Sequence, residues 1–102
     1  MANRQRGEIE AELDGRTWAL CLTLGALAEL EAKLAAGDLI TLAKRFEAGK
    51  LSAADAIAVI GAGLRGAGNE IDDAAVAAMR VAGGAAGYVA IVAELLTATF
   101  GG

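Results

Sequence analysis

Near the N-terminus two short stretches alternate apolar and polar side chains, and Asp14-Gly15 separates them. Asp-Gly between alternating runs is a strong signal for a two-residue type I′ turn, because that turn needs positive φ at both central positions. The turn sets Leu13 opposite Arg16, and opposed residues share a face of the sheet. The sequence therefore predicts a β-hairpin over residues 7–23 whose apolar face packs on the rest of the chain and includes a buried tryptophan. That face consists of Ile9, Ala11, Leu13, Trp18, Leu20 and Leu22.

The other face of the hairpin is acidic, because it carries Glu8, Glu10 and Glu12. These glutamates either form a solvated face or bind a basic partner, and we retain them as candidate partner-binding residues. No later segment alternates in this way, and an isolated two-stranded hairpin is marginally stable with two open edges. We therefore expect a hairpin edge to pair with another chain.

After the hairpin, apolar residues recur with the helical period of 3.6, interrupted by start and stop signals. The pattern predicts an α+β fold in a single domain, residues 1–102, with the hairpin followed by a bundle of four to five short helices over 24–100. The expected N-caps are Thr23, Asp38, Ser52 and Asp72, and Gly37 is the expected C-terminal stop of the first helix. The expected helices are 24–36, 39–48, 53–65, 73–82 and 85–99.

Each helix is expected to turn an apolar stripe inward. The third helix contains Gly61 and Gly63, which weaken a helix and therefore indicate close approach by a neighbouring backbone. Glu29 and Lys33 are spaced for an i,i+4 ion pair. The expected inward residues are Leu24, Leu27, Leu30 and Leu34, then Leu39, Leu42, Ala43 and Phe46, then Ile57, Ile60 and Leu64, and finally Val76 and Met79.

The last helix is apolar on most sides, and from residue 74 onward only Arg80 and Glu94 are charged. Such a helix is either the central strut of the bundle or has one side in contact with another chain. Its main stripe, formed by Tyr88, Val92, Leu95 and Leu96 and continued by Thr99, is expected to pack on the first helix and the hairpin. Val89 and Phe100 fall on one flank and Ile91 on the other. The candidate partner-binding residues here are Tyr88, Val89, Ile91 and Phe100.

Charge and hydropathy narrow the class of partner. The net charge of −4 and the pI of about 4.7 argue against binding to nucleic acid. Mean hydropathy is +0.48, yet the longest charge-free apolar stretch, residues 81–93, is too short to span a bilayer. The polar start of the chain is unlike a secretory signal, and a single cysteine fits a reducing compartment, so we expect a cytoplasmic protein.

The sequence contains few residues of the types that support catalysis or metal binding. The chain has no histidine, one cysteine (Cys21) and one serine (Ser52), so we expect no enzyme activity, no metal, no cofactor and no small-molecule substrate. The acidic residues of "GNEIDDAA" lack the spacing of a calcium loop, and the glycines of "GAGLRGAG" do not follow a strand. Lys44, Arg45 and Lys50 form a basic cluster that is either solvated or a contact for an acidic partner.

The combination of "GEIEAELDGRTWALCLTLGALAELE", "GLRGAG" and "GGAAGYVAIVAELLTATFG" resembles the small gene-transfer-agent family proteins, which are related to phage tail assembly chaperones. The resemblance implies a chaperone that binds the tail tape-measure protein, the tail-tube (major tail) protein or both during assembly, and it supplies no catalytic or ligand residues. The alternative is a structural, tail-tube-associated subunit that self-assembles through its hairpin edge as a homo-oligomer and is incorporated in a phage-like particle. A third possibility is a small regulatory or toxin–antitoxin-like binding module.

Overall fold

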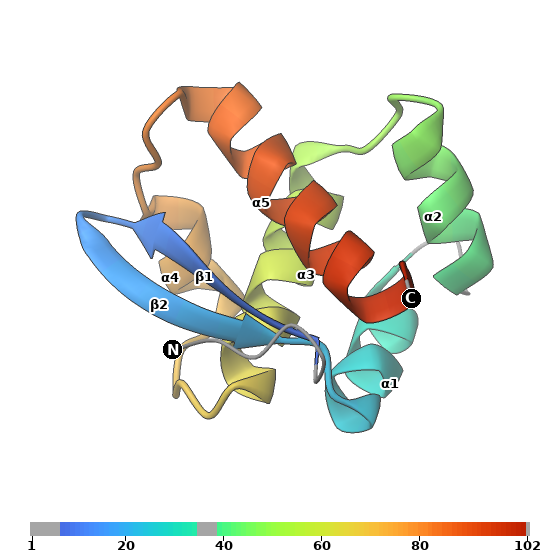
Figure 1. Ribbon diagram of the computed structural model, residues 1–102, viewed down its shortest axis with the longest axis horizontal. Coiled ribbons are helices and arrows are strands. Elements are labelled where there is room, and N and C mark those ends of the chain that lie inside the picture. The colour runs from blue at the N-terminus through green and yellow to red at the C-terminus, as the bar shows by residue number, and fades with distance from the viewer. Residues whose placement is uncertain (1–6, 35–38, 102) are drawn as a thin grey trace.

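The structure is a computed structural model that describes residues 7–34 and 39–101. A two-stranded antiparallel hairpin is followed by five helices, which confirms the predicted α+β class (Figure 1). The strands are β1 (Glu8–Leu13) and β2 (Arg16–Cys21). The helices are α1 (Leu24–Lys33), α2 (Leu39–Glu47), α3 (Ala53–Gly66), α4 (Asp73–Ala78) and α5 (Gly84–Phe100).

The hairpin has the predicted register, with Leu13 opposite Arg16. Asp14 and Gly15 have φ values of 57° and 75°, as a type I′ turn requires. The apolar face is buried except at Trp18, so the prediction of a fully buried tryptophan was wrong. The Trp18 indole N–H donates to the Leu13 carbonyl at 3.0 Å, and the Arg16 guanidinium lies 4.6 Å from the ring centroid. The ring therefore lies near the turn of the hairpin, where it packs against the edge of the core and also contacts the Arg16 guanidinium, and it stays partly exposed.

Helix α3 is the central element of the fold, which corrects the expectation that α5 could be the central strut. It packs against β2, α1, α4 and α5, while α5 packs against α3 and both strands. Figure 1 shows α3 behind the hairpin and α5, with α4 and α2 toward opposite ends of the molecule. Helix α3 can occupy the centre because most of its side chains are small. It is built largely from alanine and glycine, so its neighbours can approach it from several sides. Its buried residues run from Asp55 and Ala56 through Ala58, Val59, Ile60, Gly61, Ala62 and Gly63 to Leu64.

Three glycines of α3 are sites of close approach, although the expected neighbour was a backbone. At Gly63 a Cβ would lie 2.7 Å from Leu95 Cδ2, and at Gly61 it would overlap the Asp73 carboxylate, so side chains occupy that space. Only Gly66, which the sequence did not single out, faces a backbone group, the Cys21 carbonyl. These close contacts let the hairpin, α4 and α5 pack directly on α3.

The caps at Thr23, Ser52 and Asp72 are confirmed, since each side chain accepts a backbone N–H three residues on. Helices α1 and α4 end earlier than predicted, at Lys33 and Ala78, while Gly37 and Asp38 lie outside the described residues. In both helices the next residue has extended backbone, which stops the helix.

Leu24 was expected to be the first inward residue of α1, but it is 85% exposed, so this prediction was wrong. The buried face of α1 is set by Ala26 and Leu30. Leu24 lies two positions before Ala26, which corresponds to about 200° of rotation around the helix. Because Ala26 faces α3, Leu24 points to the opposite side. Leu34 is buried as expected, and Leu27 is half-buried.

Ion pairs link the helices around α3. Arg65 of α3 bonds the Glu29 carboxylate of α1 at 2.5 Å and Asp73 of α4 at 3.0 Å. Lys33 joins the same two carboxylates, at 3.2 Å to Glu29 in the predicted i,i+4 pair and at 2.9 Å to Asp73. Arg45 of the basic cluster pairs with Asp55 at 2.8 Å and ties α2 to α3. The hydrogen bond from Arg65 is the main reason that the pKa of Glu29 is lowered.

Candidate docking surface

An apolar groove opens between the start of α3, helix α4 and the start of α5. Its cavity volume is about 330 Å³, within the size range of small-molecule and side-chain pockets. Its lining contains no charged residue and is mainly aliphatic. The lining residues are Leu51, Ser52, Ala53, Ala56, Ile57, Val76, Ala77, Ala85, Tyr88 and Val89.

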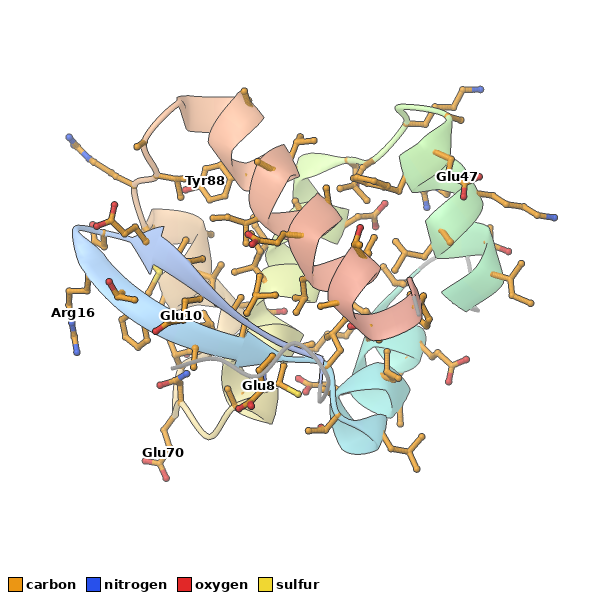
Figure 2. The ribbon with its side chains drawn as sticks, viewed as in Figure 1. Glu8, Glu10, Arg16, Glu47, Glu70 and Tyr88 are labelled. Atoms are coloured by element: carbon orange, nitrogen blue, oxygen red, sulfur yellow. The ribbon has the colours of Figure 1, made fainter. Side chains whose placement is uncertain are left out.

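The α5 wall of the groove is set by a glycine turn and a tyrosine. Gly83 and Gly84 have φ values of 87° and 58°, and this left-handed backbone turns the chain between α4 and α5. The Tyr88 hydroxyl donates to the Met79 carbonyl at the end of α4. Figure 2 shows Tyr88 pointing from α5 toward the segment that joins these helices. This hydrogen bond holds the start of α5 next to the end of α4, and it therefore fixes the position of the groove wall that α5 provides.

The opposite wall comes from the start of α3 and the residue before its cap. The Ser52 hydroxyl accepts the Asp55 N–H at 3.1 Å, which fixes the helix start. Leu51 and Ile57 are half-buried and lie against the core with part of their surface toward the groove. Asp55, on the first turn of α3, is buried and its charge is paired with Arg45, so the aliphatic wall is not interrupted by an exposed charge.

The structure separates the four candidate residues of α5. Tyr88 and Val89 line the groove, and Val89 is 47% exposed at its rim. Phe100, at 49% exposed, lies three helical turns further along the same flank as Val89. Ile91 is buried, so its flank belongs to the core. The main stripe packs on α3 and the hairpin; contact with the hairpin was expected, whereas contact with α3 was not.

The glutamates of the hairpin form a separate surface. Glu10 and Glu12 are exposed and Glu8 is partly so, and Figure 2 shows Glu8 and Glu10 along the hairpin, away from Tyr88. The chain therefore has two distinct candidate surfaces, an apolar groove and an acidic strand.

Sequence reasoning missed most of the groove. Leu51, Ala77 and Ala85 were not singled out, and Ile57 was expected only as an inward residue of its helix, because a groove depends on which helices become neighbours. It also missed Ile40, which is 70% exposed on α2. The available signal was the nearly charge-free sequence after residue 74, which indicated exposed apolar surface without locating it.

The described residues contain no group of three or more His, Cys, Asp or Glu side chains placed to hold a metal ion. Over the same ranges, none of the helices combines the length and hydropathy needed to cross a bilayer. The Cys21 thiol is half-buried, and burial raises its pKa, which lowers its reactivity as a nucleophile.

The described residues thus carry an uncharged aliphatic groove and, apart from it, an acidic strand. Residues 6–102 match the family model described as phage tail tube protein, GTA-gp10. The chain belongs to this family, which confirms the resemblance to gene-transfer-agent and phage tail proteins. No curated protein and no solved structure matches the chain.

Proposed function

We propose that this protein is a tail assembly chaperone that binds another tail protein, the tape-measure protein or the tail-tube protein, in the cytoplasm. The observation that carries the proposal is the uncharged aliphatic groove between α3, α4 and α5. Membership of the tail tube family supplies the context of tail assembly. The role needs binding and release of a partner, and we propose that it involves no catalysis, metal or cofactor.

The groove suits the apolar face of a partner helix. Helix-in-groove recognition places side chains at i, i+3 or i+4, and i+7 into an apolar depression. Val89 at the rim and Tyr88 in the wall would contact such side chains, and Phe100 extends the exposed flank along α5. A tape-measure protein with apolar helical stripes would be kept soluble while these stripes are covered.

A second candidate function is a structural subunit that remains in the tail and contacts copies of itself. Membership of a family of tail tube proteins favours this alternative. The same groove would then hold a neighbouring subunit rather than a departing partner. Analysis of finished particles separates the two, because a chaperone is scarce in them and a subunit is stoichiometric.

The test of the proposal is co-purification of the chain with the proteins of the neighbouring tail genes, using two matched variants of α5. Val89→Glu places a carboxylate at the groove rim, where 47% exposure lets the monomer fold. It should weaken partner binding at least tenfold, since a carboxylate would be buried without a partner in the complex. Thr97→Glu places the same charge on an exposed position of α5 that does not line the groove, and it should bind like the wild type. Equal binding by both variants would refute the groove as the docking surface.

A further inference from the structure

The two edges of the hairpin differ. In a hairpin with a two-residue turn the flanking residues, Leu13 and Arg16, form a hydrogen-bonded pair, and the pairs then alternate along the ladder. The pairs Glu12–Thr17, Glu10–Ala19 and Glu8–Cys21 are therefore the ones whose backbone N–H and C=O groups point out of the hairpin. A hydrogen bond from another part of the chain to the Ala19 carbonyl agrees with this assignment.

The β2 edge is occupied by the end of α3 and the loop after it. The Asn69 side-chain amide donates to the Ala19 carbonyl at 2.9 Å and to the Leu64 carbonyl at 3.1 Å, which links the strand to α3. The Cys21 carbonyl lies directly against Gly66. A further strand could not pair along this edge without displacing Asn69 and the last turn of α3.

The β1 edge is open at Glu10 and Glu12. Among the described residues, no hydrogen bond from another element reaches the backbone of either residue. Both residues are exposed, and unpaired backbone groups in native proteins face water. They offer two N–H donors and two C=O acceptors in the spacing of a strand.

The negative charge of the glutamates along β1 favours a positively charged partner strand. Antiparallel pairing of β1 with the β1 strand of a second copy would set glutamates beside glutamates, and like charges directly opposite one another are destabilising. A strand with Lys or Arg at alternate positions would instead place a cation beside each glutamate on the outer face. We propose that the outer edge of β1 pairs with an extended segment of another protein that carries Lys or Arg at every second residue.

The proposal extends the proposed function by a second contact, since the hairpin edge and the groove lie apart on the surface. It rests on the protein being a binding protein, but its test uses a different ligand from the groove test. The probe is the acetylated and amidated peptide Lys-Val-Lys-Val-Lys, added to the isotope-labelled full chain and followed by amide NMR shifts. The Glu10 and Glu12 amides should shift in a saturable way, with less change at Thr17 on the β2 edge. Raising the salt to 0.5 M should weaken binding several-fold.

Matched peptides and variants complete the test. The peptide Glu-Val-Glu-Val-Glu should not bind, and the double variant Glu10→Gln/Glu12→Gln should weaken the lysine peptide at least fivefold while keeping every backbone group. Glu10→Pro removes one outward N–H and should abolish binding, while Thr17→Pro removes the outward N–H of the other edge and should not. Near-UV circular dichroism of Trp18 reports whether the hairpin remains folded in each variant.

The edge inference is overturned if the lysine peptide fails to shift Glu10 and Glu12, or if the glutamine double variant binds it as well as the wild type. Val89→Glu should bind the peptide normally, because the groove is not involved. Loss of tail-protein binding by Val89→Glu with no peptide binding by the wild type would keep the proposed function and remove only the edge. Normal tail-protein binding by Val89→Glu, together with peptide binding by the wild type, would instead support the edge and refute the groove as the docking surface.

Discussion

Single glycines determine how closely the hairpin packs on α3. Gly66 faces the Cys21 carbonyl, and a Cβ at this position would overlap it. Gly66→Ala should therefore destabilise the protein by roughly 1–3 kcal/mol, as overpacking does. Gly25→Ala is the matched control in α1, where the nearest atom to an added Cβ is Thr23 Oγ1 at 4.0 Å. It should be stabilising by about 0.5–1 kcal/mol, because alanine favours the helix. Urea unfolding measures both, and a neutral Gly66→Ala would contradict the close packing.

The half-buried Trp18 gives a second prediction at this scale. Trp18→Phe keeps an aromatic ring but loses the indole hydrogen bond to the Leu13 carbonyl. The expected loss of stability is about 1 kcal/mol, the usual net value of one hydrogen bond. A full burial of the indole would have made Trp18→Ala cost about 3–5 kcal/mol. Its partial exposure predicts a smaller cost for Trp18→Ala, and a Trp18→Phe loss above about 3 kcal/mol in chemical unfolding would contradict the half-buried position.

The residue scale is also where sequence reasoning worked best. The Asp14-Gly15 turn and the caps at Thr23, Ser52 and Asp72 were predicted because their signals are local and need no knowledge of the neighbours. The half-burial of Trp18 was not predicted, because it depends on where the hairpin ends relative to the helices.

At the scale of elements, the ion network of Glu29, Lys33, Arg65 and Asp73 holds α1 and α4 on α3. Burial alone would raise the pKa of Asp73, but hydrogen bonds from Lys33 and Arg65 outweigh it, and the pKa is lowered. The pKa of Glu29 is lowered mainly by its hydrogen bond from Arg65. The stability contributed by both carboxylates is therefore fully present above their unfolded pKa values of about 4 and is lost as the pH falls through the lowered folded values.

Asp73→Asn tests this network. The variant should be less stable than the wild type at pH 7, and the difference should shrink as the pH falls from 5 to 3, where the wild type loses the same interaction. Thermal unfolding at several pH values measures the difference. Glu31→Gln, a change at an exposed residue of α1 outside the network, should leave the pH dependence nearly unchanged. An Asp73→Asn curve parallel to that of the wild type over this range would refute the coupling.

The packing of elements was only partly predictable. The apolar last helix indicated either a central strut or one side in contact with another chain. In the structure Ile91 is buried and Val89 is exposed at the groove rim, which leaves one flank of α5 open, and its contact with another chain stays a proposal. The central helix turned out to be α3, whose glycines lowered its expected helix propensity but allow close contacts from several neighbours. Propensity is a local property, whereas the benefit of a missing Cβ appears only when another element approaches.

A glutamate at position 91 should unfold the domain, whereas a glutamate at position 89 should leave it folded. Ile91→Glu buries an unpaired carboxylate and should unfold the domain at a cost of several kcal/mol or more. Val89→Glu should leave a soluble, folded chain, because the rim is exposed to water. Circular dichroism during heating distinguishes them, and a folded Ile91→Glu variant with native stability would contradict the assignment of this flank to the core.

For the whole molecule, the sequence predicted the class of fold and an exposed apolar surface, because these follow from composition and hydrophobic period. It could not predict the groove. Leu51 and Ala77 acquire a common surface only when the chain folds, and neither residue has a local signal that marks it. The same limit applies to the hairpin edges, since the contact of Asn69 with Ala19 joins residues far apart in the sequence.

The central claim is that this tail-family protein binds another tail protein during assembly and then leaves it. The most direct test is quantitative mass spectrometry of two fractions from the same producing cells, the soluble assembly intermediates and the purified finished particles. The account predicts that the chain co-purifies with a tape-measure or tail-tube protein in the soluble fraction and is scarce in finished particles. A chain present in finished particles in fixed stoichiometry with the tail-tube protein would contradict the chaperone role and establish it as a structural subunit.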